Sequence, residues 1–264
     1  MVAITKFQRE HIFEAVKLLY TELAETPEKA YHFPKGRSAC RHVGYPEELL
    51  ETIPERTVES FAGVGYPFAC DVIKKGDTVL DIGSGSGTDV MVAARQVTNS
   101  GKVYALDMTE AMLNKLKGNM EDAGITNVEY LAGNADDEIP LPDNSVDVIT
   151  SNGVINLIPD KGGVCKEIMR VLKPGGYIQI SDIVIGDKAS ELDESKKNPR
   201  LWAECIVGAV DANDYVEMFR ECGITNVTLI DKLDYFSASP NPVTKEVAAS
   251  FDAHAIVIRG QKPF

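Results

Sequence analysis

The most constraining feature of this sequence is a regular alternation between short apolar runs and segments of helical periodicity, from residue 77 to residue 183. Apolar runs of strand length that alternate with helices are typical of a parallel sheet covered on both faces. The predicted strands are Thr78–Ile82, Lys102–Asp107, Val128–Ala132, Val146–Ser151 and Tyr177–Ile183. The predicted helices are Asp89–Val97, Glu110–Ala123 and Cys165–Leu172. The fold class is therefore predicted to be α/β.

The segment before residue 77 differs from this region in composition and periodicity. Residues 4–25 carry apolar side chains at helical spacing, which predicts an amphipathic helix. Residues 26–70 are rich in glycine, proline and aromatic residues, and one short helix is predicted there from Pro46 to Ser60. We therefore expect residues 1–70 to form a helical and looped cap over a main domain of residues 71–264.

The alternation stops after the fifth predicted strand. Residues 186–212 are polar and partly helical, and we interpret them as an insertion. The pattern then predicts a helix over Asp214–Cys222 and two strands, Val227–Ile230 and Ala253–Arg259. Because they follow each other closely, these strands are expected to form an antiparallel hairpin that completes the sheet. The whole sheet is then mostly parallel and has seven strands.

Composition argues against several classes of protein. The 264 residues include 27 Lys and Arg against 40 Asp and Glu, a net charge of −13, which disfavours nucleic acid and anionic membrane surfaces as partners. No apolar run reaches the ~18 residues of a transmembrane helix. The first ten residues lack the apolar core of a signal peptide, so a cytoplasmic location is expected. Five widely spaced cysteines without a CxxC pair argue against a disulfide framework or a zinc site, and no metal site is predicted.

The strongest local signal is Val79–Gly87, Val-Leu-Asp-Ile-Gly-Ser-Gly-Ser-Gly, which follows a predicted strand and opens a predicted helix. Glycines at such a turn let a ligand approach the backbone closely. The spacing departs from the GxGxxG pattern of dinucleotide sites, because Thr88 stands where the third glycine would be expected. No lysine follows the glycines, which argues against a nucleoside triphosphate site.

An acidic residue completes this signal. Asp107 ends the second predicted strand, twenty residues after Gly87. A carboxylate at that place can accept two hydrogen bonds from a ribose diol, and it would repel a 2′-phosphate. The glycine loop and Asp107 together predict a site for an adenosine-containing ligand.

These motifs resemble those of the class I S-adenosylmethionine (SAM)-dependent methyltransferases, in the family's order, from Asp81-Ile-Gly-Ser-Gly-Ser-Gly87 to Leu172-Lys-Pro-Gly-Gly176. The resemblance implies a Rossmann-like fold, SAM as cofactor and S-adenosylhomocysteine as product. It implies that the glycine loop holds the methionine end of SAM, Asp107 the ribose and Met108 the adenine. The implied cofactor-binding residues are Asp81, Gly83, Ser84, Gly85, Gly87, Asp107, Met108, Asn134, Ala135, Ser151 and Asn152.

Within that class, residues 76–230 are similar to the arsenite methyltransferases. The stretches that carry the similarity include Asp107-Met-Thr-Glu-Ala-Met112, Ser151-Asn-Gly-Val-Ile-Asn-Leu157 and Trp202-Ala-Glu-Cys-Ile-Val-Gly-Ala209. The family holds thiophilic trivalent arsenic with cysteine thiolates. Cys205 matches one of these positions. Gly153 stands at another, and Cys40 or Cys70 could replace a third from the N-terminal region.

Two functional interpretations follow from the resemblance. In the first, the protein methylates arsenite or a related metalloid, with Cys205 as a ligand. In the second, it has lost the arsenic site at Gly153 and methylates a bulkier organic acceptor. The fold alone also permits a module that binds SAM without catalysis. The partner expected in the first two cases is a small molecule, and the protein is expected to be a monomer or a homodimer.

A hydroxyl or amine acceptor would need a general base, whereas a thiol or arsenite would need little help. The candidate catalytic residues are Cys205, Asp182 and His32, and His42 and Glu204 are further candidate bases. Each of the three has a structural alternative. Cys205 could pack beside Trp202, Asp182 could cap the next segment, and His32 could bind a backbone carbonyl.

The remaining polar and cysteine positions have plainer interpretations. Cys165 and Cys222 fall on predicted helices with apolar neighbours and are expected to lie in the core. The acidic run Asp136-Asp-Glu138 is expected to form a solvated loop, with contact between Asp136 and the adenine amino group as the alternative.

Overall fold

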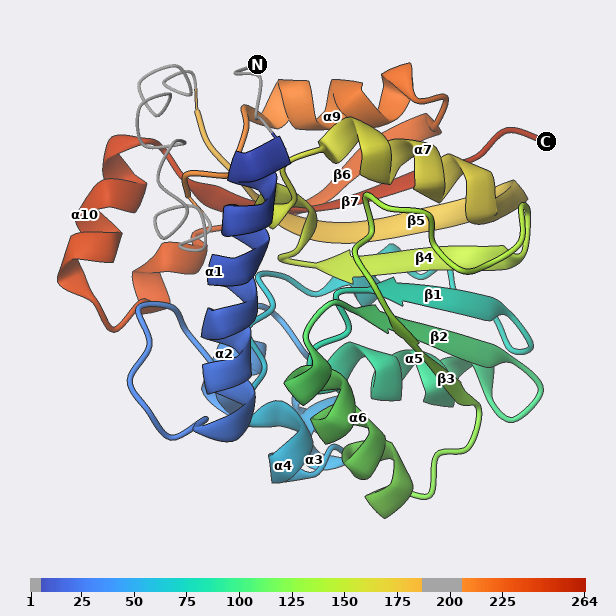
Figure 1. The fold of residues 1–264 in the computed structure, drawn as a ribbon, viewed down its shortest axis with the longest axis horizontal. Coiled ribbons are helices and arrows are strands. Elements are labelled where there is room, and N and C mark those ends of the chain that lie inside the picture. The colour runs from blue at the N-terminus through green and yellow to red at the C-terminus, as the bar shows by residue number, and fades with distance from the viewer. Residues whose placement is uncertain (1–5, 187–205) are drawn as a thin grey trace.

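The structure is a computed structural model that describes residues 6–186 and 206–264. The described residues form one seven-stranded sheet in the order β3-β2-β1-β4-β5-β7-β6 (Figure 1). Its strands are β1 (Thr78–Ile82), β2 (Lys102–Asp107), β3 (Val128–Ala132), β4 (Val146–Asn152), β5 (Leu172–Val184), β6 (Thr225–Leu233) and β7 (His254–Gln261). Strands β1 to β5 are parallel, and β7 pairs antiparallel with both β5 and β6. This confirms the mostly parallel seven-stranded sheet with an antiparallel C-terminal strand.

Side chains on the central strands alternate between two buried faces, as the continuous apolar runs predicted. Val79 and Val148 belong to one core cluster, together with apolar residues of α5 (Thr88–Val97) and α6 (Glu110–Asp122). Leu80 and Ile149 belong to the other, together with α7 (Lys161–Val171) and α9 (Ala212–Glu221). Strands buried on both faces in this way bring the loops at their carboxyl ends to one edge of the sheet, where open α/β folds bind ligands.

The first seventy residues pack into the same core. They contribute α1 (Lys6–Glu25), α2 (Gly36–His42), α3 (Glu47–Glu51), α4 (Glu55–Val58) and the 3₁₀ turn η1 (Pro67–Cys70). Ile12 and Val16 of α1 share the first core cluster with strand residues, and α1 runs past the carboxyl ends of the central strands and contacts α6 (Figure 1). Helix α1 is positioned by Arg9, which donates two hydrogen bonds to Asp136 at 2.9 and 2.8 Å.

Two local predictions were wrong. The single helix expected from Pro46 to Ser60 is two short helices, α3 and α4, because Pro54 lacks an N–H and stands at the N-cap of α4. The last two strands do pair antiparallel, but η5 (Tyr235–Ala238) and α10 (Pro242–Ser250) lie between them. Proline begins α10, and the Asn241 side chain caps it by accepting from the backbone N–H of Val243 at 2.9 Å.

Of the predicted insertion 186–212, residues 187–205 lie outside the described residues. Among the helices that the structure describes, none combines the length and the apolar character needed to cross a membrane.

Candidate functional site

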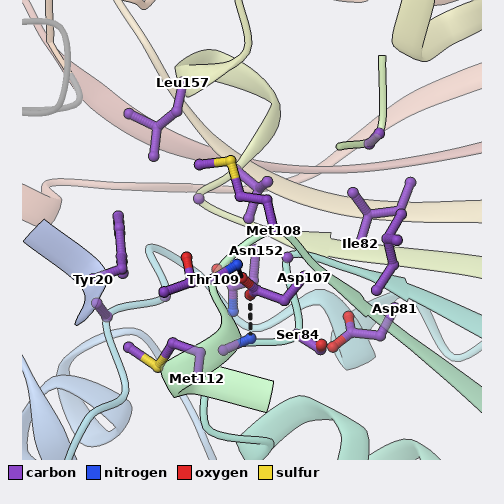
Figure 2. A pocket seen from close by; sticks show the side chains of 18 of the residues that line it. Tyr20, Asp81, Ile82, Ser84, Asp107, Met108, Thr109, Met112, Asn152 and Leu157 are labelled. Atoms are coloured by element: carbon purple, nitrogen blue, oxygen red, sulfur yellow. Dashed lines mark hydrogen bonds between the residues drawn. The ribbon is translucent and has the colours of Figure 1, made fainter. Parts of the chain in front are cut away.

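A pocket of about 940 Å³, including the part open to solvent, lies at the carboxyl ends of β1, β2 and β4. The β1–α5 loop and the first residue after β2 line one side, and residues 133–135 after β3 line another. Phe13, Val16 and Tyr20 of α1 and residues 60–63 complete the wall. Figure 2 shows Tyr20 and Asp81 on opposite sides of the pocket in this view, with Met108, Asn152 and Ser84 between them.

Two glycines shape the floor of this pocket. Gly83 has φ +74°, and a Cβ there would lie 2.2 Å from Cγ2 of Val154, which also lines the pocket. Gly85 has φ +49° and only open space where a Cβ would stand. Ser84 lies between them, and its buried Oγ has no hydrogen-bond partner among the described residues. The loop therefore presents backbone and one unpaired hydroxyl to a ligand.

Asp107 is fixed at the end of β2 by the glycine loop itself. Its carboxylate accepts from the backbone N–H of Gly85 at 2.9 Å and from that of Thr109 at 2.8 Å. Burial raises the pKa of Asp107, and these backbone hydrogen bonds oppose that rise. Each oxygen accepts one backbone hydrogen bond, which leaves acceptor capacity for a diol.

Asp107 shares the pocket with two further buried carboxylates, Asp81 and Asp89. Burial raises the pKa of Asp81 well above its ordinary value, and the negative charges of Asp89 and Asp107 raise it further. Within the described residues, no hydrogen bond or ion pair reaches the Asp81 carboxylate, and no Lys, Arg or His lines the pocket. Uncompensated buried negative charge of this kind favours a cationic ligand and disfavours a pyrophosphate.

Nine of the eleven residues predicted to bind a cofactor line this pocket. They are Asp81, Gly83, Ser84, Gly85, Asp107, Met108, Asn134, Ala135 and Asn152. Gly87 does not: its φ is +97°, and a Cβ there would meet Cγ of Leu116 in α6 at 2.8 Å. Ser151 does not either, because its Oγ donates to the backbone carbonyl of Ile82 at 3.0 Å and joins β4 to β1. Both residues lie outside the pocket lining and make structural contacts at the adjacent edge of the sheet.

Asp182 is placed outside the pocket lining, in a buried polar cluster. Its carboxylate accepts from the Tyr215 hydroxyl at 2.7 Å and from the backbone N–H groups of Asn156 and Ile183 at 2.8 and 2.9 Å. Burial raises its pKa to about 6, against the effect of these hydrogen bonds and of the nearby Lys161 ammonium. The cluster fixes η2 (Ile155–Leu157), whose Leu157 lines the pocket. The geometry of Asp182 is that of a structural carboxylate.

His32 is also absent from the pocket lining. Its backbone carbonyl accepts from Ser239 Oγ at 2.6 Å, and its ring stacks edge-on against Phe33 at a centroid distance of 4.9 Å. Burial lowers the pKa of His32, and its buried Nε2 has no partner among the described residues. His42 bonds the backbone carbonyls of Asp234 and Tyr235.

The described cysteines supply no thiol to the pocket. Cys40 and Cys70 are buried elsewhere, and burial raises the pKa of both thiols, that of Cys70 to about 12. Cys165 is buried in the second core cluster and Cys222 packs against it, as expected. Cys205 and Glu204 lie outside the described residues.

The solvated loop predicted for the acidic run is wrong at Asp136. Its side chain is 0% exposed and is held by the Arg9 guanidinium, with Asp137 on the same cation at 2.8 Å. Asp136 therefore fastens α1 over the pocket. The sequence could not indicate this partner, because Arg9 and Asp136 are 127 residues apart.

The site also contains residues that the sequence analysis missed. Asp89, at the start of α5, accepts from Asn152 Nδ2 at 3.0 Å and from the Tyr45 hydroxyl. Asn152 Oδ1 accepts in turn from the backbone N–H of Val64 at 2.7 Å. An acidic residue directly after the glycine motif was the only sequence signal for this network.

Comparison with known proteins decides the family. A family model described as a methyltransferase domain matches residues 73–223. The chain belongs to the methyltransferase domain family. Its fold and glycine motif place it among the class I SAM-dependent methyltransferases, which confirms the family expected from the sequence, and SAM is the cofactor of that class.

Within this family the chain is similar to arsenite methyltransferases. It is 38% identical over 195 residues to one from Halobacterium salinarum and 40% identical over 189 residues to one from Aquipseudomonas alcaligenes. These alignments cover 74% and 69% of this chain but 49% and 54% of the relatives, so the chain spans about half of their length. A crystal structure of an arsenic(III) SAM methyltransferase from Chlamydomonas reinhardtii superposes with a TM-score of 0.64 and 28% identity, over 88% of this chain and 75% of that one.

Proposed function

We propose that this methyltransferase binds SAM in the pocket described above and transfers its methyl group to a small-molecule acceptor. The observation that carries the proposal is the set of three carboxylates, the buried Asp81 and Asp89 and the half-buried Asp107, around a glycine loop with no basic side chain among the described lining residues. SAM has a positive sulfonium and a positive ammonium against one carboxylate. A net cation with a ribose diol fits this site better than a nicotinamide dinucleotide does.

Different residues of the pocket would hold different parts of SAM. Asp107 would accept the ribose hydroxyls, Met108 would pack on the adenine, and the glycine loop with Asp81 would hold the methionine end. When bound, SAM supplies an electrophilic methyl carbon, and the protein contributes position and a dry cavity. Apolar side chains from α1, including Phe13 and Val16, support this role because they close the side of the pocket opposite the sheet.

The relatives suggest the first acceptor to test. Proteins named arsenite methyltransferases align with more than two thirds of this chain, and we propose arsenite as the first acceptor to test. A thiolate ligand would have to come from Cys205, since Gly153 has no side chain and the described cysteines lie away from the pocket. We further propose that residues 1–70 act as a cap, that 186–212 lie over the acceptor, and that the protein works in the cytoplasm as a monomer or homodimer.

The test is release of S-adenosylhomocysteine from SAM, with and without arsenite and dithiothreitol, alongside calorimetric binding of SAM. Release stimulated by arsenite supports the arsenic acceptor, and Cys205→Ser should then abolish the stimulation. SAM binding without arsenite-stimulated release would move the search to organic acceptors. Absence of SAM binding would overturn the proposed function.

A further inference from the structure

Methyl transfer from a sulfonium to a neutral acceptor always leaves one proton to be removed. The S–CH₃ bond breaks and its electron pair stays on sulfur, while a lone pair of the acceptor forms the new bond to carbon. The acceptor then carries the positive charge and loses it as a proton, from an O–H or N–H group, or from a hydroxyl on arsenic in the case of arsenite. This holds for any neutral acceptor, so the balance rests only on the proposed SAM-dependent transfer.

The carboxylates among the described lining residues of the pocket are those of Asp81, Asp89 and Asp107. Asp107 is at the end of β2 and already accepts from the backbone N–H of Gly85, in the β1–α5 loop, and from that of Thr109, just before α6. Asp81 is in β1, beneath the glycine loop, with both neighbouring carboxylates acting on it. Asp89 differs from both, because it contacts Asn152 at the end of β4.

The order of the strands indicates which part of the ligand each of these carboxylates would face. In the sheet, β2 and β3 lie on one side of β1, and β4 lies on the other. Asp107 and Asn134 follow β2 and β3, so the adenosine end of the ligand belongs to that side. With the ribose held at Asp107, the sulfonium end of SAM would lie nearer to β4 and its residue Asn152. Asp89 and Asn152 are therefore at the reacting end of the pocket.

We propose that Asp89 is the proton acceptor of the methyl transfer, held in place by Tyr45 and Asn152. Asn152 Nδ2 donates to one Asp89 oxygen at 3.0 Å, and the Tyr45 hydroxyl donates to the other. Asn152 Nδ2 also lies 3.2 Å from the Tyr45 oxygen, which closes a triangle of three polar groups. Tyr45 lies outside the pocket lining, so it is a positioning residue that acts through Asp89.

The electrostatic surroundings suit this role. Burial raises the pKa of Asp89 to about 6, and the hydrogen bonds from Tyr45 and Asn152 hold it down. The other ionisable groups that sense its charge are Asp81 of β1, Cys40 of α2 and Tyr66, which precedes η1. A carboxylate with a pKa near 6 is ionised at neutral pH and basic enough to take a proton.

Two isosteric variants test the assignment. With arsenite and dithiothreitol as the probe, Asp89→Asn should lower kcat by about tenfold, less than the 100-fold or more usual for a lost proton-transfer group because arsenite needs little help from a base, while the Kd for SAM changes less than fivefold. In the wild type, kcat should fall below an apparent pKa near 6. Tyr45→Phe should move that acid limb to higher pH, because the hydrogen bond from Tyr45 lowers the pKa of Asp89.

Tyr66→Phe is the matched control. The Tyr66 ring packs against Tyr45 at a tilt of 60°, with 4.7 Å between the ring centroids, but its hydroxyl makes no hydrogen bond to Asp89, so this variant should leave the pH profile in place. An equal loss of SAM affinity and kcat in Asp89→Asn would overturn the proposal and make Asp89 a cofactor ligand. Unchanged kcat would also overturn it, while wild-type turnover would leave the proposed function standing.

A titration that needs no turnover provides a second check. Infrared difference spectra of the complex with S-adenosylhomocysteine, wild type against Asp89→Asn, should show one carboxyl group that titrates near pH 6. Titration of that group near pH 4 would overturn the proposal whatever acceptor the enzyme uses.

Discussion

Asp182 and Asp81 are both buried aspartates in parallel strands of one sheet, yet the chain surrounds them in opposite ways. Asp182 in β5 accepts three hydrogen bonds from Tyr215, Asn156 and Ile183, and a buried lysine is near. Asp81 in β1 receives no hydrogen bond or ion pair from any described residue, and its nearest charges are negative. Burial raises the pKa of both carboxyl groups.

The difference separates a carboxylate that holds the fold from one that awaits a ligand. A buried charge without partners lowers stability, so a fold retains it where binding provides the compensation. A buried charge whose hydrogen bonds come from its own chain has little capacity left for a substrate. Burial and a shifted pKa therefore do not identify a carboxylate that binds a ligand, whereas acceptor positions left unused by the chain do.

The largest effect is expected from removing the Asp182 carboxylate, which already accepts three hydrogen bonds from the chain. Asp182→Ala leaves the Tyr215 hydroxyl and two backbone N–H groups buried without an acceptor. We expect the free energy of unfolding to fall by about 3–5 kcal/mol. Urea unfolding followed by circular dichroism measures it. If stability is instead unchanged and only turnover is lost, Asp182 acts on substrate, as the sequence alone suggested.

A smaller effect, on binding rather than on folding, is expected at Asp81. Asp81→Asn removes a buried charge that no described group compensates, so the free energy of unfolding without ligand should stay the same or rise. The Kd for SAM should increase ten- to a hundredfold, or about 1.5–3 kcal/mol for a lost charged hydrogen bond. Calorimetry with SAM and urea unfolding on the same sample would separate the two effects. A destabilised variant with normal affinity would contradict the comparison.

The sequence predicted the strands well because their apolar runs report burial on both faces directly. Four of the first five strands agree with the structure within one residue at each end, and β5 begins earlier than expected, at Leu172. The prediction was wrong where tertiary contacts decide the conformation. Pro54 divides the expected helix into two, and α10 occupies a connection that the sequence suggested was a hairpin.

The site was predictable where ligand contacts come from backbone and from strand ends. Gly83, Gly85 and Asp107 line the pocket because their positions follow from the order of strand, turn and helix. The partners of Asp89 and Asp182 could not be predicted, because Tyr45 and Tyr215 reach them from segments 44 and 33 residues away. The sequence showed where carboxylates stand, but it did not show which of them already accept hydrogen bonds from the chain.

The smallest effect is expected from the pH dependence of SAM binding. Burial raises the pKa of both Asp89 and Asp182 to about 6, and this dependence distinguishes the two residues. Asp89 faces the pocket, whereas Asp182 does not. A cationic ligand favours the ionised form of Asp89, so binding SAM below pH 6 must release the proton that this group holds. The affinity for SAM should therefore be level above about pH 7 and fall by less than about fivefold between pH 7 and pH 5, the limit that Asp89→Asn sets for the loss of this charge.

Asp182 titrates over the same range without contact with the ligand, so Asp182→Asn should keep this pH dependence of the Kd. Asp89→Asn should flatten it, apart from any contribution of Asp81. Calorimetric titrations of SAM at half-unit steps from pH 5 to pH 7.5, on the wild type and both variants, make the comparison. A slope that disappears in Asp182→Asn and persists in Asp89→Asn would reverse the roles assigned to the two carboxylates. In that case Asp182 would affect ligand binding even though its oxygens already accept hydrogen bonds from the chain.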